Sequence, residues 1–204
     1  MKDFGEAAIL CGGKSVRMGF DKSLAKINDS YMIESIYRKL SCAFETVKLC
    51  ANSKEKFGMF DMPIVEDTHK GKGPAAAIHA VLSQAATKYV FVVACDMPLV
   101  NIEHVAFMKQ LIKEKTSSQG CAPDALIPIK GGYIEPLYGF YSTNISKTFE
   151  EEIESGNFKI ADILQKCRTV YMDEKYSVMF DKNLRMFTNL NYREDFEGIV
   201  WLKQ

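Results

Sequence analysis

The chain has 204 residues, of which 47% are hydrophobic, 25% charged and 11% aromatic. Its 26 basic residues balance its 26 acidic residues, so the formal net charge at pH 7 is zero. This composition is sufficient for the core of one globular domain over residues 1–204. The balanced charge argues against binding to nucleic acid or an anionic membrane by bulk attraction, which normally requires a basic excess. A polyanionic ligand must therefore be bound at a local site.

Targeting and cysteine features together predict a cytoplasmic protein. The longest apolar run, Tyr89 to Cys95, is far shorter than the ~18 residues of a membrane span. The first six residues include acids and begin no signal-peptide core. The six cysteines form no C-x-x-C pair, and Cys11 and Cys95 end apolar runs, which favours reduced, buried thiols.

The first 120 residues alternate short apolar runs with helical periodicity, as in a parallel sheet covered by helices. Ser30 is predicted to cap the first helix, Pro74 to begin the second and Asn101 to cap the third. The short apolar runs predict four strands, at residues 7–11, 46–51, 62–65 and 89–95.

The second half of the chain is less regular. Residues 125–129 and 134–141 predict strands that flank a Gly131-Gly132 turn, hence an antiparallel element. A helix is expected over 145–153, and Asn191 with Glu194 predicts the start of a closing helix. The fold class is therefore predicted to be α/β, with three layers and a mostly parallel sheet that has a small antiparallel part in the C-terminal half.

A glycine-rich loop directly follows the first predicted strand. It contains Gly12, Gly13, Arg17 and Lys22, and it lies where open α/β sheets bind their ligands. Glycines let backbone N–H groups approach phosphate oxygens, and the cations neutralise the charge. The loop matches neither a Walker A motif nor G-x-G-x-x-G. The alternative is a flexible glycine turn with solvated lysines, but the position after a strand and the density of cations favour phosphate binding.

Asp96 follows the most apolar predicted strand. A carboxylate there needs backbone N–H donors or a cation. Beside a phosphate loop, the sharper hypothesis is Mg²⁺ bound to Asp96 and to nucleotide phosphate, because Mg²⁺ prefers one or two carboxylates with phosphate oxygens and water. The alternative is a turn aspartate at a strand end.

Asn52 and Asp67 follow two further predicted strands and point to the same edge of the sheet. Asn52 could bond a base or ribose, and Asp67 precedes the flexible loop that contains Gly71 and Gly73. Taken alone, each residue is better interpreted as a cap or turn residue. By contrast, His69, His79 and His104 show no metal-ligand spacing and are interpreted as ordinary surface or core histidines.

The segment from Ile9 to Leu24 resembles the L-x-G-G-x-S-x-R-M-G-x-D-K-x-x-L signature of the molybdenum cofactor guanylyltransferases, a family of Rossmann-like nucleotidyltransferases. Asp21-Lys22 is the guanylyltransferase-like pair within it, whereas the cytidylyltransferase relatives tend to have Asn-Lys or Pro-Lys. The resemblance continues through further motifs and covers nearly the whole chain. These motifs are Ala51-Asn52, Val65-Glu66-Asp67, Gly73-Pro74, Cys95-Asp96-Met97-Pro98, Glu135-Pro136-Leu137-Tyr138 and Phe187-Thr188-Asn189-Leu190-Asn191.

The resemblance implies roles for individual residues. Asp96 would bind Mg²⁺ near the α-phosphate, while Arg17 and Lys22 would neutralise and contact the triphosphate as catalytic cations. Asn189 and Asn191 would lie on the acceptor side, although Asn191 is also interpretable as a plain helix cap. The residues that would bind GTP are Leu10, Cys11, Gly12, Gly13, Lys22, Asn52, Asp67 and Asp96. Residues 1–120 would mainly bind the nucleotide, and residues 121–204 mainly the acceptor.

The implied reaction is transfer of GMP from GTP to the phosphate of molybdopterin, which releases pyrophosphate and forms molybdopterin guanine dinucleotide. The nucleophile is already anionic, so no Ser-His-Asp array is required. Other proteins that deliver or receive the cofactor are expected as transient partners. Two alternatives remain open: a molybdopterin cytidylyltransferase or other small-molecule nucleotidyltransferase, and a non-catalytic nucleotide-binding adaptor.

Overall fold

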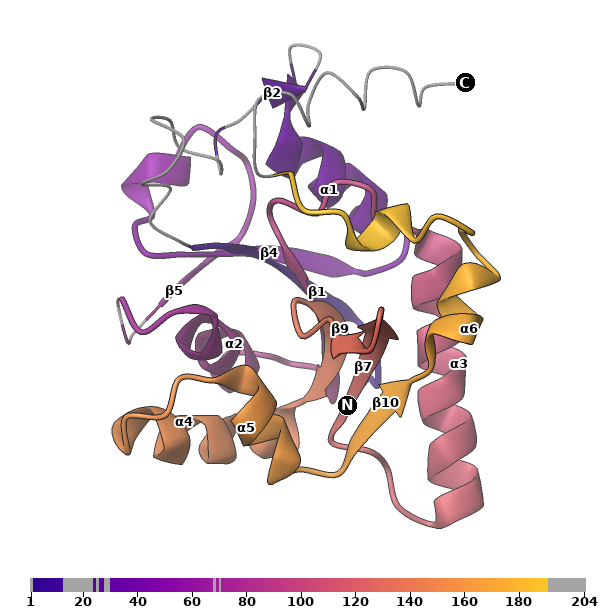
Figure 1. The fold of residues 1–204 in the computed structure, drawn as a ribbon. Coiled ribbons are helices and arrows are strands. Elements are labelled where there is room, and N and C mark those ends of the chain that lie inside the picture. The colour runs from indigo at the N-terminus through magenta and orange to yellow at the C-terminus, as the bar shows by residue number, and fades with distance from the viewer. Residues whose placement is uncertain are drawn as a thin grey trace.

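The computed structural model describes residues 2–12, 24, 26–27, 30–67, 69 and 71–190. A mixed sheet with helices on both faces forms its centre (Figure 1). The strand order is β10-β7-β9-β6-β1-β4-β5, and β8 pairs with β7 outside this path. The sheet strands are β1 (Glu6–Cys11), β4 (Thr46–Ala51), β5 (Ile64–Glu66), β6 (Tyr89–Ala94), β7 (Ala125–Lys130), β8 (Tyr133–Ile134), β9 (Tyr138–Ser142) and β10 (Thr169–Met172).

The remaining elements are a small hairpin, six α-helices and several 3₁₀ turns among the described residues. A separate small hairpin is formed by β2 (Lys26–Ile27) and β3 (Ser30–Tyr31). The α-helices are α1 (Met32–Ser41), α2 (Pro74–Ser83), α3 (Ile102–Gln119), α4 (Ser146–Glu154), α5 (Ile160–Gln165) and α6 (Glu174–Val178). The 3₁₀ turns include η2 (Glu55–Phe57), η3 (Thr143–Ile145) and η4 (Arg185–Phe187).

Two apolar layers cover the two faces of the sheet. Buried side chains of α1 and α3 pack on one face, and those of α2, α4 and α5 on the other. Figure 1 shows the second group gathered together, away from α1 and α3. β1 serves both layers, because Ile9 belongs to the first and Leu10 to the second. A strand covered on both faces has no polar alternation, which explains the continuous apolar run of β6.

The predicted fold class is confirmed. β1 pairs in parallel with β4 and β6, and β4 with β5, whereas β9 runs antiparallel to both β6 and β7. Pro74 begins α2, and the side chain of Asn101 accepts a hydrogen bond of 3.0 Å from the backbone of His104 at the start of α3. Gly131 and Gly132 form the β7–β8 turn, with φ of 56° and 81°.

Three sequence predictions about element limits are corrected. Ser30 does not cap α1: it pairs with Ile27 in the small hairpin, and the carboxylate of Glu34 instead accepts the N–H of Tyr31. The third strand lies at Ile64–Glu66 rather than at 62–65. The strand expected at 134–141 is broken, because Pro136 has no N–H and the N–H of Tyr138 turns back to the carbonyl of Glu135.

The expected closing helix at Asn191 lies outside the described residues. Earlier in the C-terminal half, β10 and α6 lie within residues 169–178. β10 extends the sheet beyond β7 in a parallel register. Within the described part of the chain, no helix is both long and apolar enough to cross a membrane.

Candidate active site at the carboxyl edge of the sheet

Four parallel strands end side by side at one edge of the sheet. The register pairs Cys11 with Ala51, Ala51 with Glu66, and Leu10 with Ala94. The residues that directly follow these strands therefore share the edge: Gly12, Asn52, Asp67 and Cys95-Asp96. Since ligands of open α/β sheets bind outside the carboxyl ends of the strands, this edge is the candidate active site.

Asp96 is held at the edge by hydrogen bonds of its neighbours and by its own backbone carbonyl. The N–H of Cys95 donates to the carbonyl of Leu10 over 3.1 Å, and the N–H of Met97 turns back to Ala94 over 3.1 Å. The carbonyl of Asp96 accepts the N–H of Leu190 over 2.9 Å. Cys95 thus joins this turn to the end of β1, and Asp96 joins it to the end of the described chain.

Asn189 is consequently a near neighbour of Asp96 in space. Its side chain is exposed, whereas Leu190 beside it is buried and belongs to the core layer of α1 and α3. The buried leucine anchors the backbone, so that the adjacent asparagine is held in the solvent beside Asp96. The structure therefore brings together two sequence-predicted site residues that lie far apart in the chain.

The described beginning of the glycine loop is open. Leu10 and Cys11 are buried at the end of β1, and Gly12 is exposed. A Cβ added at Gly12 would meet no atom within 4 Å among the residues described. Gly13, Arg17, Lys22 and Asn191, which the sequence predicts for the site, lie outside the described residues.

Asp67 shapes the loop that precedes α2. Its N–H donates to the carbonyl of Ala51 over 3.1 Å and continues the strand pairing, and its Oδ1 accepts the N–H of His69 over 2.9 Å. Asp67 is buried, with 4% of its surface exposed, whereas Asn52 is exposed. The turn role that the sequence left open for Asp67 is present, because its carboxylate accepts the N–H of His69.

Gly73 ends this loop and occupies the N-cap position of α2. Its φ of 78° lies in the left-handed region that favours glycine. Pro74 follows at the first helical position, where its missing N–H costs nothing. The N–H groups of the first turn give this end of the helix a partial positive charge, although the N–H of Ala76 already donates to the carbonyl of Gly73 over 3.2 Å.

The turn between β8 and β9 is a third segment that reaches this edge of the sheet. The carbonyl of Leu137 accepts the N–H of Ala94 over 3.0 Å, two residues before Asp96. Glu135, in the same turn, is partly buried, and this burial raises the pKa of its carboxyl group while the charge of Lys130 opposes the rise. In the sequence, Glu135 belongs to the motif Glu135-Pro136-Leu137-Tyr138, to which no role is assigned above. The signal that distinguishes it is a carboxylate directly before a proline between two strands.

Cys11 and Cys95 are buried, as predicted, and Cys50 is buried as well. The hydrogen bond with Cys95, followed by burial, raises the pKa of the Cys11 thiol well above its usual value. Burial also raises the pKa of Cys50 to about 12, and its thiol bonds to the carbonyl of Ala77 over 3.5 Å. Thiols with such values remain protonated at neutral pH, so these cysteines pack as small apolar groups.

The histidines form no metal site in the described part of the chain, where no group of three or more His, Cys, Asp and Glu side chains could hold an ion. His104 is fully buried and bonds to the hydroxyl of Ser177 over 3.0 Å, and burial lowers its pKa to about 4. His79 is also buried, and its Nε2 lies 3.1 Å from the hydroxyl of Ser83.

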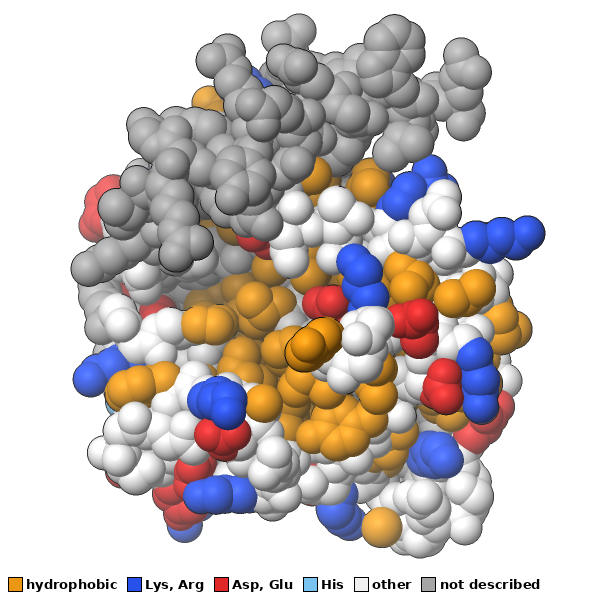
Figure 2. Space-filling view, in the orientation of Figure 1, with side chains coloured by type: hydrophobic (Ala, Val, Ile, Leu, Met, Phe, Trp, Pro, Cys, Tyr) orange, Lys and Arg blue, Asp and Glu red, His pale blue; other side chains and the backbone are white. Residues whose placement is uncertain are grey.

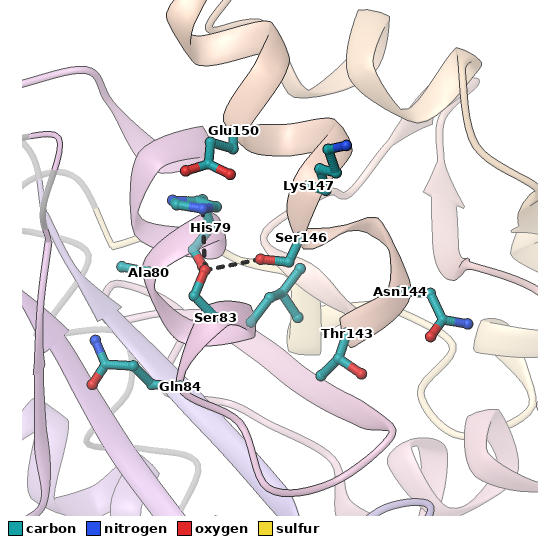
Figure 3. A pocket seen from close by; sticks show the side chains of 10 residues that line it. His79, Ala80, Ser83, Gln84, Thr143, Asn144, Ser146, Lys147 and Glu150 are labelled. Carbon is teal, nitrogen blue, oxygen red and sulfur yellow. Dashed lines mark hydrogen bonds between the residues drawn. The ribbon is translucent and has the colours of Figure 1, made fainter.

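A shallow hollow of about 640 Å³ lies between α2 and α4. Figure 3 shows the Ser83 hydroxyl between His79 and Ser146, with Glu150 beside the imidazole. Ser83 bonds to the carbonyl of His79 over 2.9 Å and to Ser146 over 2.8 Å. The Ser83 hydroxyl thus has both backbone and side-chain partners. We therefore interpret His79 as a core histidine in a polar contact between two helices, and not as the base of a nucleophile–base pair.

The fold and the edge geometry define the class of the protein: a Rossmann-like nucleotidyltransferase. A structure from Archaeoglobus fulgidus described as molybdopterin-guanine dinucleotide biosynthesis protein A matches with a TM-score of 0.81 and 28% identity, covering 98% of this chain and all of that one. A 4-diphosphocytidyl-2C-methyl-D-erythritol synthase from Anaerococcus prevotii has a TM-score of 0.66 at 10% identity, a similarity of fold alone.

The sequence relatives identify the family within this class. The model of the MobA-like NTP transferase domain matches residues 7–170. A probable molybdenum cofactor guanylyltransferase of Peptoclostridium acidaminophilum is 37% identical, over 95% of this chain and 87% of its own length. A molybdenum cofactor guanylyltransferase of Syntrophotalea carbinolica is 34% identical, over 98% and 92%. The chain belongs to the MobA-like NTP transferases of the molybdenum cofactor guanylyltransferase family, and it is an enzyme.

Proposed function

We propose that the protein transfers GMP from GTP to the phosphate of molybdopterin, releasing pyrophosphate and forming molybdopterin guanine dinucleotide. The observation that carries this proposal is the convergence on Asp96. The β1 end, the turn at 135–137 and the segment ending at Leu190 are hydrogen-bonded to β6 or to the turn that follows it. A transferase needs two substrates beside one carboxylate, and this arrangement supports a nucleotide on one side of Asp96 and an acceptor on the other.

The sheet order separates the two substrates in the proposed complex. β4 and β5, which lead to Asn52 and Asp67, lie on one side of β1, whereas β9 lies beyond β6. The guanosine end of GTP is proposed to contact Asn52 and Asp67, with its phosphates over the loop from Leu10 to Gly13. The acceptor is proposed to lie toward Asn189 and Asn191, so that residues 1–120 mainly bind nucleotide and 121–204 mainly bind acceptor.

Mg²⁺ is proposed as the cofactor, and the donor set fits it. Among the residues described, no cage of three or more ligating side chains is present. An ion that takes one or two carboxylates and completes its shell with phosphate oxygens and water suits Asp96 at a strand end. When bound there, Mg²⁺ would neutralise phosphate charge.

The chain's own groups address the electrostatic barrier of the reaction. The nucleophile is an anionic phosphate oxygen, so the enzyme needs no general base to activate it. Arg17 and Lys22 are proposed to offset the repulsion between the two anions and the charge that grows on pyrophosphate. The backbone N–H groups of the glycine loop would orient the triphosphate for in-line attack.

The two alternative functions differ from this one either in the nucleotide base that is transferred or in having no catalytic activity. A cytidylyltransferase would keep the same phosphate machinery, and the pair Asp21-Lys22 together with the guanylyltransferase relatives favours guanine. An adaptor would not need the phosphate loop and Asp96 together. A cytoplasmic location and transient contacts with proteins that deliver or receive the cofactor are proposed with the function.

A nucleotide panel tests the proposal. Purified protein, Mg²⁺ and molybdopterin are incubated separately with GTP, CTP and ATP, and pyrophosphate release is measured together with the mass of the product. We expect the guanine dinucleotide and preferred turnover with GTP. Equal or better turnover with CTP would transfer the protein to the cytidylyltransferases, and binding of nucleotide with no turnover would support an adaptor.

A further inference from the structure

We propose that Glu135 recognises the pterin ring of the acceptor, accepting hydrogen bonds from its 2-amino group and N3–H. This inference rests on the proposed function and adds a specificity-determining residue to it. The observation behind it is a partly buried carboxylate in the turn between β8 and β9, beside β6 and the candidate active site.

The backbone of the turn fixes the position of Glu135. Its N–H donates to the carbonyl of Pro128 over 2.8 Å, and its own carbonyl accepts the N–H of Tyr138 over 3.1 Å. Two residues on, Leu137 is bonded to Ala94 at the end of β6. Tyr138, which begins β9, is buried and pairs with Val93. A carboxylate on such a rigid turn can serve as a fixed acceptor.

The carboxylate is not used within the protein. Among the described residues, the side chain of Glu135 forms no hydrogen bond or ion pair, and Lys130 acts on it only as a nearby charge. Leaving a partly desolvated carboxylate without N–H donors costs free energy. A ligand that brings two adjacent N–H donors would recover that cost.

The pterin ring carries such a pair of donors on its 2-amino-4-oxopyrimidine edge, and the two oxygens of a carboxylate can accept both. Guanine presents a similar edge, so the sheet order decides between the two. Glu135 lies at β9, on the far side of β6 from β1, whereas Asn52 and Asp67 lie at β4 and β5. Glu135 is therefore assigned to the acceptor rather than to the guanosine.

The surrounding surface suits a flat heteroaromatic ring. Figure 2 shows hydrophobic side chains gathered on this face over the region of β7 to β9, with charged side chains beside them. Leu137 packs against both core layers and is itself only partly buried. An apolar surface with a carboxylate beside it is the usual composition of a site that selects a heterocycle.

The first experiment separates acceptor recognition from nucleotide binding. Steady-state turnover is measured for the wild type, Glu135→Gln and the control Glu151→Gln, an exposed carboxylate on α4. For Glu135→Gln we expect the KM for molybdopterin to rise about 10-fold or more, with kcat within about two-fold and an unchanged Kd for GTP. The control should match the wild type. An unchanged acceptor KM, or a Kd for GTP that weakens in parallel, would overturn the assignment.

A second experiment keeps this inference distinct from the proposed function. Binding of pterin-6-carboxylate and of lumazine-6-carboxylate, which lacks the 2-amino group, is measured by fluorescence without any turnover. We expect the wild type to prefer the pterin by at least about five-fold and Glu135→Gln to lose that preference. Equal affinity for the two probes, or no binding of either, would contradict the role of Glu135. Absence of GMP transfer with the pterin preference intact would instead contradict the proposed reaction alone.

Discussion

The backbone N–H of Leu190 donates a 2.9 Å hydrogen bond to the carbonyl oxygen of Asp96. This bond brings the backbone of the C-terminal motif, and with it Asn189, to the residue that follows the most apolar strand. Because Leu190 is 1% exposed, the contact is supported by core packing rather than by a surface loop alone. The two predicted halves of the proposed active site are thereby joined at one point of the backbone.

Replacement of Asp96 tests the proposed metal ligand. Asp96→Asn keeps the shape of the side chain but removes its charge, so we expect folding to be retained and Mg²⁺-dependent turnover to fall by about 100-fold or more. Turnover is measured across a Mg²⁺ titration, and folding is followed by thermal unfolding. Asp61→Asn, at an exposed position before β5, is the matched control. Full activity of Asp96→Asn would remove this carboxylate from the mechanism.

Replacement of Lys22 tests the phosphate contact. Lys22→Ala should weaken GTP binding by about 10-fold, because one charge-assisted contact to the triphosphate is lost. Calorimetric titration with GTP gives the Kd, and the exposed Lys54→Ala should bind as the wild type does. Raising the salt concentration should reduce the difference in Kd for GTP between Lys22→Ala and Lys54→Ala, because salt screens the charge of Lys22. If Lys22→Ala retained its affinity for GTP, the proposed contact would be absent.

Replacement of Asn189 tests the acceptor side. The side chain is exposed beside Asp96, so Asn189→Ala should raise the KM for molybdopterin by several-fold without changing the Kd for GTP. Asn183→Ala, also at an exposed position, serves as the control. A loss of GTP affinity would place Asn189 on the nucleotide side instead.

His104 makes stability depend on pH in a defined direction. Burial lowers its pKa in the folded protein to about 4, compared with 6.5 for an ordinary histidine. The unfolded chain therefore binds this proton first, and the contribution of the neutral imidazole to stability is lost as pH falls below about 6.5. Between pH 7.5 and 5.5 the loss from this group is about 1 kcal/mol.

The measurement is urea unfolding of the wild type and of His104→Phe at both pH values. The phenyl ring fits an aromatic surrounding that includes Tyr138, Phe180 and Phe187 and cannot titrate. The variant also loses the bond to Ser177 at every pH. The titration of His104 is therefore measured by how the difference in free energy of unfolding between the two proteins changes from pH 7.5 to 5.5. Identical pH dependence of the two proteins would show that His104 titrates normally.

The buried thiols should resist modification. Cys11 and Cys50 have raised pKa values and are buried, whereas Cys42 and Cys121 are exposed. The test is brief treatment with iodoacetamide at pH 7.5, followed by peptide mass analysis. Cys42 and Cys121 should be labelled about 100-fold faster than Cys11 and Cys50. Labelling of Cys11 in the native protein at the rate of Cys42 would contradict its packed environment.

The fold was predictable where each element obeys one local rule. The unbroken apolar run of β6 requires burial on both faces, and Pro74 and Asn101 carry the chemistry that begins a helix. Ser30 failed as a cap because Tyr31 holds the N-cap position and Ser30 belongs to a hairpin, which no local pattern reveals. The break at 135–137 was missed for a similar reason: the hydrogen bond from Ala94 to Leu137 is a tertiary contact.

The candidate site was predictable to the level of one sheet edge. Residues that follow parallel strands must share that edge, and this rule placed Asn52, Asp67 and Asp96 together. The sequence could not supply the Leu190–Asp96 bond, since it joins segments that are distant in the chain. Nor could it distinguish Glu135 from other acidic residues near turns, because only the structure shows that its carboxylate is partly buried and unbonded among the described residues.

Tracing the phosphorus of GTP tests GMP transfer most directly. The protein, Mg²⁺ and molybdopterin are incubated in parallel with GTP labelled at the α-phosphate and with GTP labelled at the γ-phosphate, and the products are separated. The α-label should appear in the pterin dinucleotide and the γ-label only in pyrophosphate. A γ-label transferred to the pterin, or an α-label that remains in nucleotide alone while molybdopterin is unchanged, would contradict guanylyl transfer to the cofactor.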